Sequence, residues 1–155
     1  MKKKRLQLFI FFLIINFGAL GIGSWLMNNG PMTDWYINLS KAPWTPPGWV
    51  FGAAWTTIMI CFSYFMTVLY LMDNSTKVKT LFIIQIILNV SWNYIFFNQH
   101  YIFLALINIV LLTGLVLYFL INFRSQLKMK SLLILPYAIW LCIATSLNYY
   151  IYLFN

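Results

Sequence analysis

The sequence contains few charged residues and very few acidic ones. Of 155 residues, 8% are charged, and the only acidic residues are Asp34 and Asp73. The chain therefore lacks the carboxylate pair that acid–base catalysis uses, and it has neither a phosphate-binding loop nor a nucleophile beside a base. Its one histidine, His100, and its two cysteines, Cys61 and Cys142, show no metal-ligand spacing and no CxxC motif. We expect no metal site, no bound cofactor and no disulfide framework.

Apolar residues dominate the chain. They make up 63% of it, and aromatic residues make up 20%, whereas an ordinary soluble domain is about 45–50% apolar. A membrane span needs about 20 mostly apolar residues to cross roughly 30 Å of hydrocarbon. The sequence therefore predicts an all-α membrane protein, a bundle of five transmembrane helices that forms one integral membrane domain over residues 1–155. The five predicted spans are residues 6–27, 49–72, 81–97, 101–123 and 131–154.

The basic residues lie in short clusters between these spans. The formal net charge is +8, but the clusters do not form the continuous patch of a nucleic-acid-binding protein, so we expect no nucleic acid partner. Nine of the ten Lys and Arg residues fall at the N-terminus and in two alternate loops, and the tenth is Lys41, after the first span. Cytoplasmic segments of membrane proteins carry an excess of Lys and Arg. We therefore predict a cytoplasmic N-terminus and an external C-terminus.

The long connection between the first two spans, residues 28–48, does not have the composition of a flexible linker. It contains Trp44, Pro46 and Pro47, and Trp49 follows directly. Prolines and aromatic residues restrict the chain, so we predict an ordered lid over the outer ends of the helices. Pro46 and Pro47 also mark the start of the second span, because proline fits the first turn of a helix. The alternative for any single Trp or Tyr near a span end is a place in an interfacial aromatic belt.

The third span carries a polar and aromatic face. Gln85, Asn89, Trp92, Asn93 and Phe96 follow helical spacing and fall on one side of the helix. Polar residues within a membrane span lie against protein rather than lipid. This face is therefore predicted to point into the bundle.

The fifth and second spans offer matching groups. Trp140, Ala144 and Asn148 share one face of the fifth span. The second span offers Trp49, Trp55 and Thr56, with Ala53 as a small neighbour. Together the faces predict an aromatic pocket with a few amide groups, suited to a large flat ligand with polar edges. The alternative is that the Asn and Gln side chains only hydrogen-bond between helices.

Three segments resemble the TspO/MBR family, which comprises the tryptophan-rich sensory proteins of bacteria and the mitochondrial translocator protein. Residues 41–57, KAPWTPPGWVFGAAWTT, resemble the signature of the family. Residues 88–97, LNVSWNYIFF, resemble its third helix, and residues 135–149, LPYAIWLCIATSLNY, resemble its fifth. The resemblance covers the whole five-helix layout.

The resemblance implies a fold, a set of ligands and a cellular role. The fold is a five-helix bundle whose first loop covers a ligand cavity, usually as a homodimer, here in a bacterial cell membrane. The ligands are porphyrins such as protoporphyrin IX and synthetic isoquinoline carboxamides, which suggests a role in tetrapyrrole or stress homeostasis. Animal members carry a cholesterol motif near the end of the fifth helix, but residues 147–155 contain no Lys or Arg, so cholesterol binding is not implied here.

The resemblance also assigns residues. Trp44 and Trp49 match signature tryptophans that frame the loop. Some bacterial members degrade protoporphyrin in light, and Trp55 and Trp140 would then donate electrons beside the excited ligand. A transporter of porphyrin or another amphipathic solute is the alternative to a binding protein or such an enzyme. The ligand-binding positions of the family fall on Tyr36, Trp55, Asn93, Phe96, Trp140 and Ala144.

Overall fold

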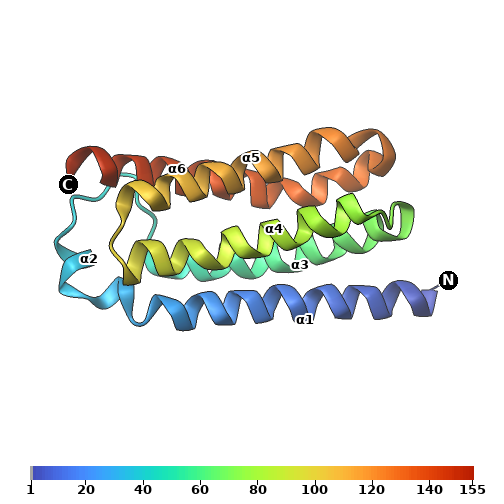
Figure 1. Ribbon diagram of the computed structural model, residues 1–155, viewed down its shortest axis with the longest axis horizontal. Helices are drawn as coiled ribbons and strands as arrows, with labels where there is room; N and C mark the ends of the chain where they lie inside the picture. The colour runs from blue at the N-terminus through green and yellow to red at the C-terminus, as the bar shows by residue number, and fades with distance from the viewer. Residues whose placement is uncertain (1) are drawn as a thin grey trace.

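The computed structural model describes residues 2–155, and its long helices run side by side and antiparallel (Figure 1). This arrangement confirms the predicted all-α bundle of five long helices. The N-terminus and the C-terminus lie at opposite ends of the bundle. The long helices are α1 (Lys2–Met27), α3 (Gly48–Met72), α4 (Thr76–Asn93), α5 (Ile102–Leu127) and α6 (Leu135–Phe154).

The last two long helices form one continuous helical stretch in the chain. Residues Ile102–Phe154 make a continuous helical run of 53 residues, in which the 3-10 helix η3 (Lys128–Ile134) joins α5 to α6. A straight helix of that length would measure about 80 Å, more than twice the thickness of the hydrocarbon layer. The chain instead reverses direction at η3, as Figure 1 shows. The stretch therefore makes two spans, and the bundle has five.

The observed helices differ from the predicted spans at their ends. α4 begins at Thr76 instead of residue 81, because the Ser75 hydroxyl accepts a hydrogen bond of 3.4 Å from the amide of Val78 and caps a polar first turn. α1 begins at Lys2, and α5 continues to Leu127. Backbone hydrogen bonding continues beyond the apolar segment, so hydropathy underestimates the length of these helices.

The half of the bundle nearest the N-terminus is filled by a dense aromatic core. Phe62, Phe65 and Phe119 are fully buried, and the ring of Tyr137 packs edge-on against Phe62 with the ring centroids 5.3 Å apart. Gln85 donates a hydrogen bond of 2.7 Å to the Tyr137 hydroxyl. Gln85 was predicted on the face of the pocket, but it lies deeper and bonds between helices, which is the alternative role for such amides.

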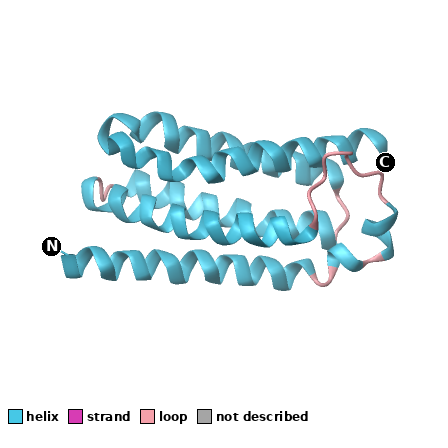
Figure 2. Ribbon diagram, turned by 180° about the vertical axis from the view of Figure 1, so that it is seen from behind, coloured by secondary structure: helices cyan, strands magenta, loops and turns pink. Residues whose placement is uncertain are grey.

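The loop between α1 and α3, residues 28–47, is called the lid below. It contains the 3-10 helix η1 (Gly30–Met32) and the short helix α2 (Asp34–Asn38). The Thr33 hydroxyl accepts a hydrogen bond of 3.4 Å from the Tyr36 amide and caps α2. Figure 2 shows most of the loop segments at the end of the bundle where the C-terminus lies. The prediction of a long ordered first loop is confirmed, although α2 was not foreseen.

The lid is attached to α6 near the C-terminus. The Asn155 side chain accepts a hydrogen bond of 2.8 Å from the Ser40 amide and donates one of 3.2 Å to the Ser40 carbonyl. The Trp44 indole donates to the Ser146 hydroxyl at 3.2 Å and packs edge-on against Tyr150. These contacts fix the second half of the lid.

The first half of the lid is attached to the turn after α4. The ring of Trp35 stacks on His100, with centroids 3.9 Å apart and an interplanar angle of 12°. Gly30 packs closely against Phe97, because a Cβ atom at position 30 would lie 2.5 Å from the Phe97 Cβ. Only glycine permits this approach. The lid is therefore held on two opposite sides of the bundle.

Candidate functional site

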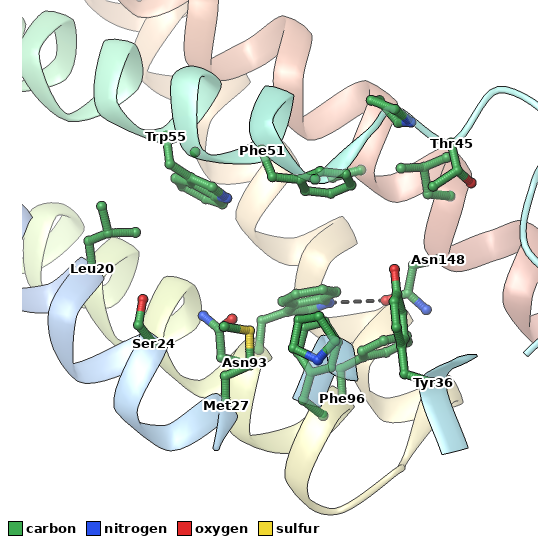
Figure 3. A pocket seen from close by; sticks show the side chains of 18 of the residues that line it. Leu20, Ser24, Met27, Tyr36, Thr45, Phe51, Trp55, Asn93, Phe96 and Asn148 are labelled. Atoms are coloured by element: carbon green, nitrogen blue, oxygen red, sulfur yellow. Dashed lines mark hydrogen bonds between the residues drawn. The ribbon is translucent and has the colours of Figure 1, made fainter. Parts of the chain in front are cut away.

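A cavity of about 650 Å³ lies under the lid, between the lid-end halves of the helices (Figure 3). Helices α1, α3, α4 and α6 and the turn after α4 form its walls, and the lid forms its cover. The lining residues are Ala19, Leu20, Ser24, Met27, Pro31, Tyr36, Lys41, Thr45, Pro46, Gly48, Phe51, Gly52, Trp55, Thr56, Asn89, Trp92, Asn93, Phe96, Phe97, Ala144, Leu147, Asn148 and Ile151.

The α3 wall presents two aromatic side chains. Pro47 is the N-cap residue of α3, as predicted for the prolines at this point. Phe51 and Trp55 are one helical turn apart and point into the cavity from the same side (Figure 3). Trp55 also packs edge-on against Tyr137, with centroids 6.0 Å apart. Trp49 is 74% exposed and does not line the cavity.

The α4 wall supplies the opposite aromatic surface. Trp92 and Phe96 are stacked, with ring centroids 5.0 Å apart and an interplanar angle of 9°. The helix widens into a π turn, η2 (Tyr94–Asn98), which places both Phe96 and Phe97 at the cavity. Such turns are rare and often occur at functional sites. Nothing in the sequence indicated this π turn or the contribution of Phe97.

Asn148 has both of the roles that the sequence analysis gave for such amides, lining the pocket and hydrogen-bonding between helices. Its side-chain oxygen accepts a hydrogen bond of 3.0 Å from the Trp92 indole, drawn as a dashed line in Figure 3. Its side-chain nitrogen donates to the carbonyl of Ile102 at 3.3 Å. The amide thus bonds between helices and also borders the cavity, next to Ala144. It fixes the orientation of the Trp92 ring.

Trp140 is not at the cavity surface. It is buried, and its ring packs edge-on against Phe51 with centroids 5.2 Å apart. Its indole nitrogen has no hydrogen-bond partner among residues 2–155. Helical spacing predicted Trp140 on the same helix face as Ala144, but Trp140 does not line the cavity and instead packs against Phe51 of α3, which does. The structure therefore brings Tyr36, Trp55, Asn93, Phe96 and Ala144 together and leaves Trp140 one layer behind.

The α1 wall was not predicted as part of the pocket. Leu20, Ser24 and Met27 point toward the cavity at helical spacing (Figure 3). Gly23 allows α1 to approach α4, because a Cβ atom there would lie 2.8 Å from the Asn93 side-chain nitrogen. In the sequence, nothing separates Leu20, Ser24 and Met27 from the lipid-facing residues of the same helix. Only the packing of the folded bundle shows that they line the cavity.

The lid contributes the polar edge of the cavity. Tyr36 lies against Phe97, with ring centroids 5.2 Å apart. Burial raises the pKa of the Tyr36 hydroxyl above its ordinary value. A tyrosine hydroxyl is neutral near neutral pH in any case, so this group can donate a hydrogen bond there. Lys41 and Thr45 complete this edge. Trp44 frames the lid from outside the cavity, where it bonds to Ser146.

The chemistry of the cavity comes from its aromatic and hydrogen-bonding side chains. Within residues 2–155, no cluster of His, Cys, Asp and Glu side chains has the geometry to hold a metal ion. His100 is stacked on Trp35 and does not line the cavity. Two aromatic walls with a few hydrogen-bonding groups at one edge suit a flat ligand with a large apolar surface.

The chain is similar to known proteins over most of its length. The sequence model of the TspO/MBR family matches residues 10–153. The tryptophan-rich protein TspO of Archaeoglobus fulgidus is 33% identical over 144 residues, 88% of this chain and 90% of that protein. The tryptophan-rich protein TspO of Bacillus cereus is 32% identical over 157 residues and covers 98% of both chains. The human translocator protein is 28% identical over 126 residues, 78% of this chain and 75% of that protein.

Proposed function

Because this chain belongs to the TspO/MBR family, we propose that it binds a flat tetrapyrrole such as protoporphyrin IX in the cavity under the lid. Synthetic isoquinoline carboxamides would occupy the same cavity. The protein would act in tetrapyrrole or stress homeostasis, as a homodimer in the bacterial cell membrane. The single observation that carries this proposal is the cavity of about 650 Å³ between two aromatic walls.

The geometry supports a planar ligand in particular. Pockets for organic ligands of this class have volumes of about 300–1,000 Å³ and are lined mainly by apolar and aromatic side chains. Phe51 and Trp55 face the cavity from one side, and the stacked pair Trp92 and Phe96 faces it from the other (Figure 3). A macrocycle between these walls would bury both of its faces against aromatic surface.

The packing favours binding over transport. Below the cavity, the half of the bundle nearest the N-terminus is filled by fully buried residues, among them Phe62, Phe65 and Phe119. Alternating access needs a site that opens to each side in turn. A path through this bundle would require the aromatic core to separate. Transport of porphyrin or another amphipathic solute is therefore the alternative to the binding function.

Light-dependent degradation of the bound porphyrin is a second candidate activity. The observation that favours it is the position of Trp55, an oxidisable indole in the cavity wall. The reactivity would come from the photoexcited ligand and oxygen, and the protein would supply an enclosed site and the indole.

We predict that filling the cavity from α3 abolishes ligand binding. Gly52 lines the cavity, and a Cβ atom at this position meets no other atom within 4 Å. Gly52→Phe should therefore fold normally while its ring occupies ligand space, and its affinity for protoporphyrin IX should fall at least about ten-fold, or about 1.4 kcal/mol. Titration of the purified protein in the dark, followed by Soret absorbance and tryptophan fluorescence, measures this.

Gly114→Phe is the matched control. Gly114 lies in the middle of α5, does not line the cavity, and also has open space around its Cβ position. The Gly114→Phe variant should bind protoporphyrin IX with the affinity of the wild type. If the wild type does not bind protoporphyrin IX, the proposed function is wrong. If Gly52→Phe and Gly114→Phe both bind it as tightly as the wild type, the ligand does not occupy this cavity and the proposed site is wrong.

A further inference from the structure

Within residues 2–155, the cavity is lined by a single residue with a formal charge. Lys41 is that residue, and no acidic side chain is part of the lining. Asp34, the acidic residue of the lid, is exposed on α2 and does not line the cavity. The cavity therefore combines apolar walls with one cation at the edge formed by the lid.

The position of this cation is fixed by its surroundings. Lys41 is half-buried, and its ammonium group donates a hydrogen bond of 3.0 Å to the carbonyl of Ile37. The same group lies over the Tyr36 ring, 4.6 Å from the centroid. These two contacts hold the ammonium beside the cavity.

The backbone that carries Lys41 is also held on both sides. Ser40 makes two hydrogen bonds with the side chain of Asn155. Ala42 is buried, and its carbonyl accepts a hydrogen bond of 2.9 Å from the Thr45 amide. A backbone restrained by such contacts lowers the ordering entropy that the binding of an anion here would cost.

An ammonium group in this setting prefers an anionic partner. It has three N–H donors, and the hydrogen bond to Ile37 uses one of them. A hydrogen bond between charged groups is stronger than one between neutral groups, and the apolar walls reduce screening by water. One cation matches one carboxylate in charge, whereas phosphate recognition typically uses several Arg donors or a helix N-terminus.

We propose that Lys41 is a specificity-determining residue, which pairs with a carboxylate on the edge of the ligand. This inference rests on the proposed function and makes it narrower: the ligand class is a flat, apolar molecule with a carboxylate at one edge. The uncharged body lies between the aromatic walls, and the carboxylate points toward the lid. Uncharged analogues of the same shape bind less tightly.

The test compares protoporphyrin IX with its dimethyl ester, which has the same macrocycle and no carboxylate. The wild type should bind the acid about ten-fold more tightly than the ester, as expected for one charge-assisted hydrogen bond. Lys41→Met should lose this preference through weaker binding of the acid, with binding of the ester unchanged. Lys41→Arg should keep most of it. Lys128→Met, which removes the same charge from η3, away from the lining of the cavity, should resemble the wild type.

The possible results separate this inference from the proposed function. If Lys41→Met keeps the wild-type preference for the acid over the ester, Lys41 does not bind the carboxylate and the inference is wrong. If Lys41→Met weakens the binding of acid and ester equally, Lys41 only supports the lid and the inference is again wrong. If the wild type binds neither compound, the proposed function itself fails.

Discussion

Trp55 and Trp140 carry the same indole group but have different positions relative to the cavity. Trp55 forms part of the wall, whereas Trp140 does not line the cavity and packs against Phe51, which does. A residue that donates an electron to an excited ligand acts best in direct contact with it. The position of Trp140 makes it a secondary donor that would act through Phe51, so the two tryptophans should not be equivalent.

We predict that Trp55→Phe slows the photodegradation of protoporphyrin IX several-fold and that Trp140→Phe slows it less. Phenylalanine keeps an aromatic surface but is much harder to oxidise than tryptophan, so binding in the dark should change little. The loss of porphyrin absorbance under constant illumination, divided by the amount of bound ligand, measures the rate. Wild-type rates in both variants would show that neither indole takes part in the chemistry and would leave binding as the function.

The residue scale also shows where sequence patterns lose information. Helical spacing placed Trp140, Ala144 and Asn148 on one face, and Ala144 and Asn148 do line the cavity. Spacing within one helix cannot show that Phe51, from a different helix, covers Trp140. Lys41 was interpreted only as a marker of topology, because its place at the cavity depends on the fold of the lid. Spacing within a single helix therefore predicted which side of that helix faces the bundle interior, but not which side chains of other helices pack over it.

At the scale of elements, the lid is held to the bundle by contacts that differ in kind. Toward the turn after α4 the contacts are aromatic and close-packed, through Trp35 on His100 and Gly30 on Phe97. Toward α6 they are mainly hydrogen bonds, made by Asn155 and Trp44, beside one edge-on contact of Trp44 with Tyr150. The hydrogen-bonded side is exposed, so its contacts compete with water and are weaker. The lid is therefore expected to open from the α6 side.

We predict that Asn155→Ala speeds ligand release. The change removes both hydrogen bonds to Ser40, which neighbours Lys41, and each such bond contributes about 0.5–1.5 kcal/mol. Dissociation of protoporphyrin IX in stopped-flow displacement should become roughly three- to ten-fold faster, from about 1 kcal/mol of lost stabilisation.

Asn122→Ala provides the control for this change. Both residues are exposed asparagines that donate to the backbone carbonyl four residues earlier, Asn155 to Ile151 at 2.8 Å and Asn122 to Tyr118 at 3.2 Å. Asn122 lies on α5 and does not line the cavity. This variant should release ligand like the wild type. Equal release rates in Asn155→Ala and the wild type would mean that the contact with Ser40 does not restrain the lid.

The long elements could be predicted from the sequence, and the short ones could not. Apolar runs of about 20 residues determine membrane spans because the thickness of the hydrocarbon layer is fixed. The helix α2 depends on the Thr33 cap and on contacts with residues of other helices. No characteristic sequence pattern marks the π turn after α4. The sequence pair Thr33-Asp34 is a recognisable N-cap signal for α2. The lid was therefore foreseen as ordered, but its internal structure was not.

At the scale of the whole molecule, charge is distributed along the axis of the bundle. Arg5, Lys77 and Lys79 belong to the end opposite the lid (Figure 1). Their charged groups lie over the rings of Tyr64, Tyr118 and Tyr70 at 4.8, 5.3 and 5.8 Å from the centroids. Such contacts keep the apolar parts of these side chains on the protein while the charges remain at the membrane surface. The lid end carries Lys41 alone among the described Lys and Arg residues.

This asymmetry predicts that the lid end faces the outside of the cell, because the excess of Lys and Arg marks the cytoplasmic side. Cysteine labelling of intact cells tests it, in a background where Cys61 and Cys142 are replaced by alanine. A cysteine at Asn98, in the exposed turn at the lid end, should react with a membrane-impermeant maleimide. A cysteine at Lys128, on the opposite end, should react only after the membrane is permeabilised. The reverse pattern would place the lid in the cytoplasm, and the ligand would then reach the cavity from inside the cell.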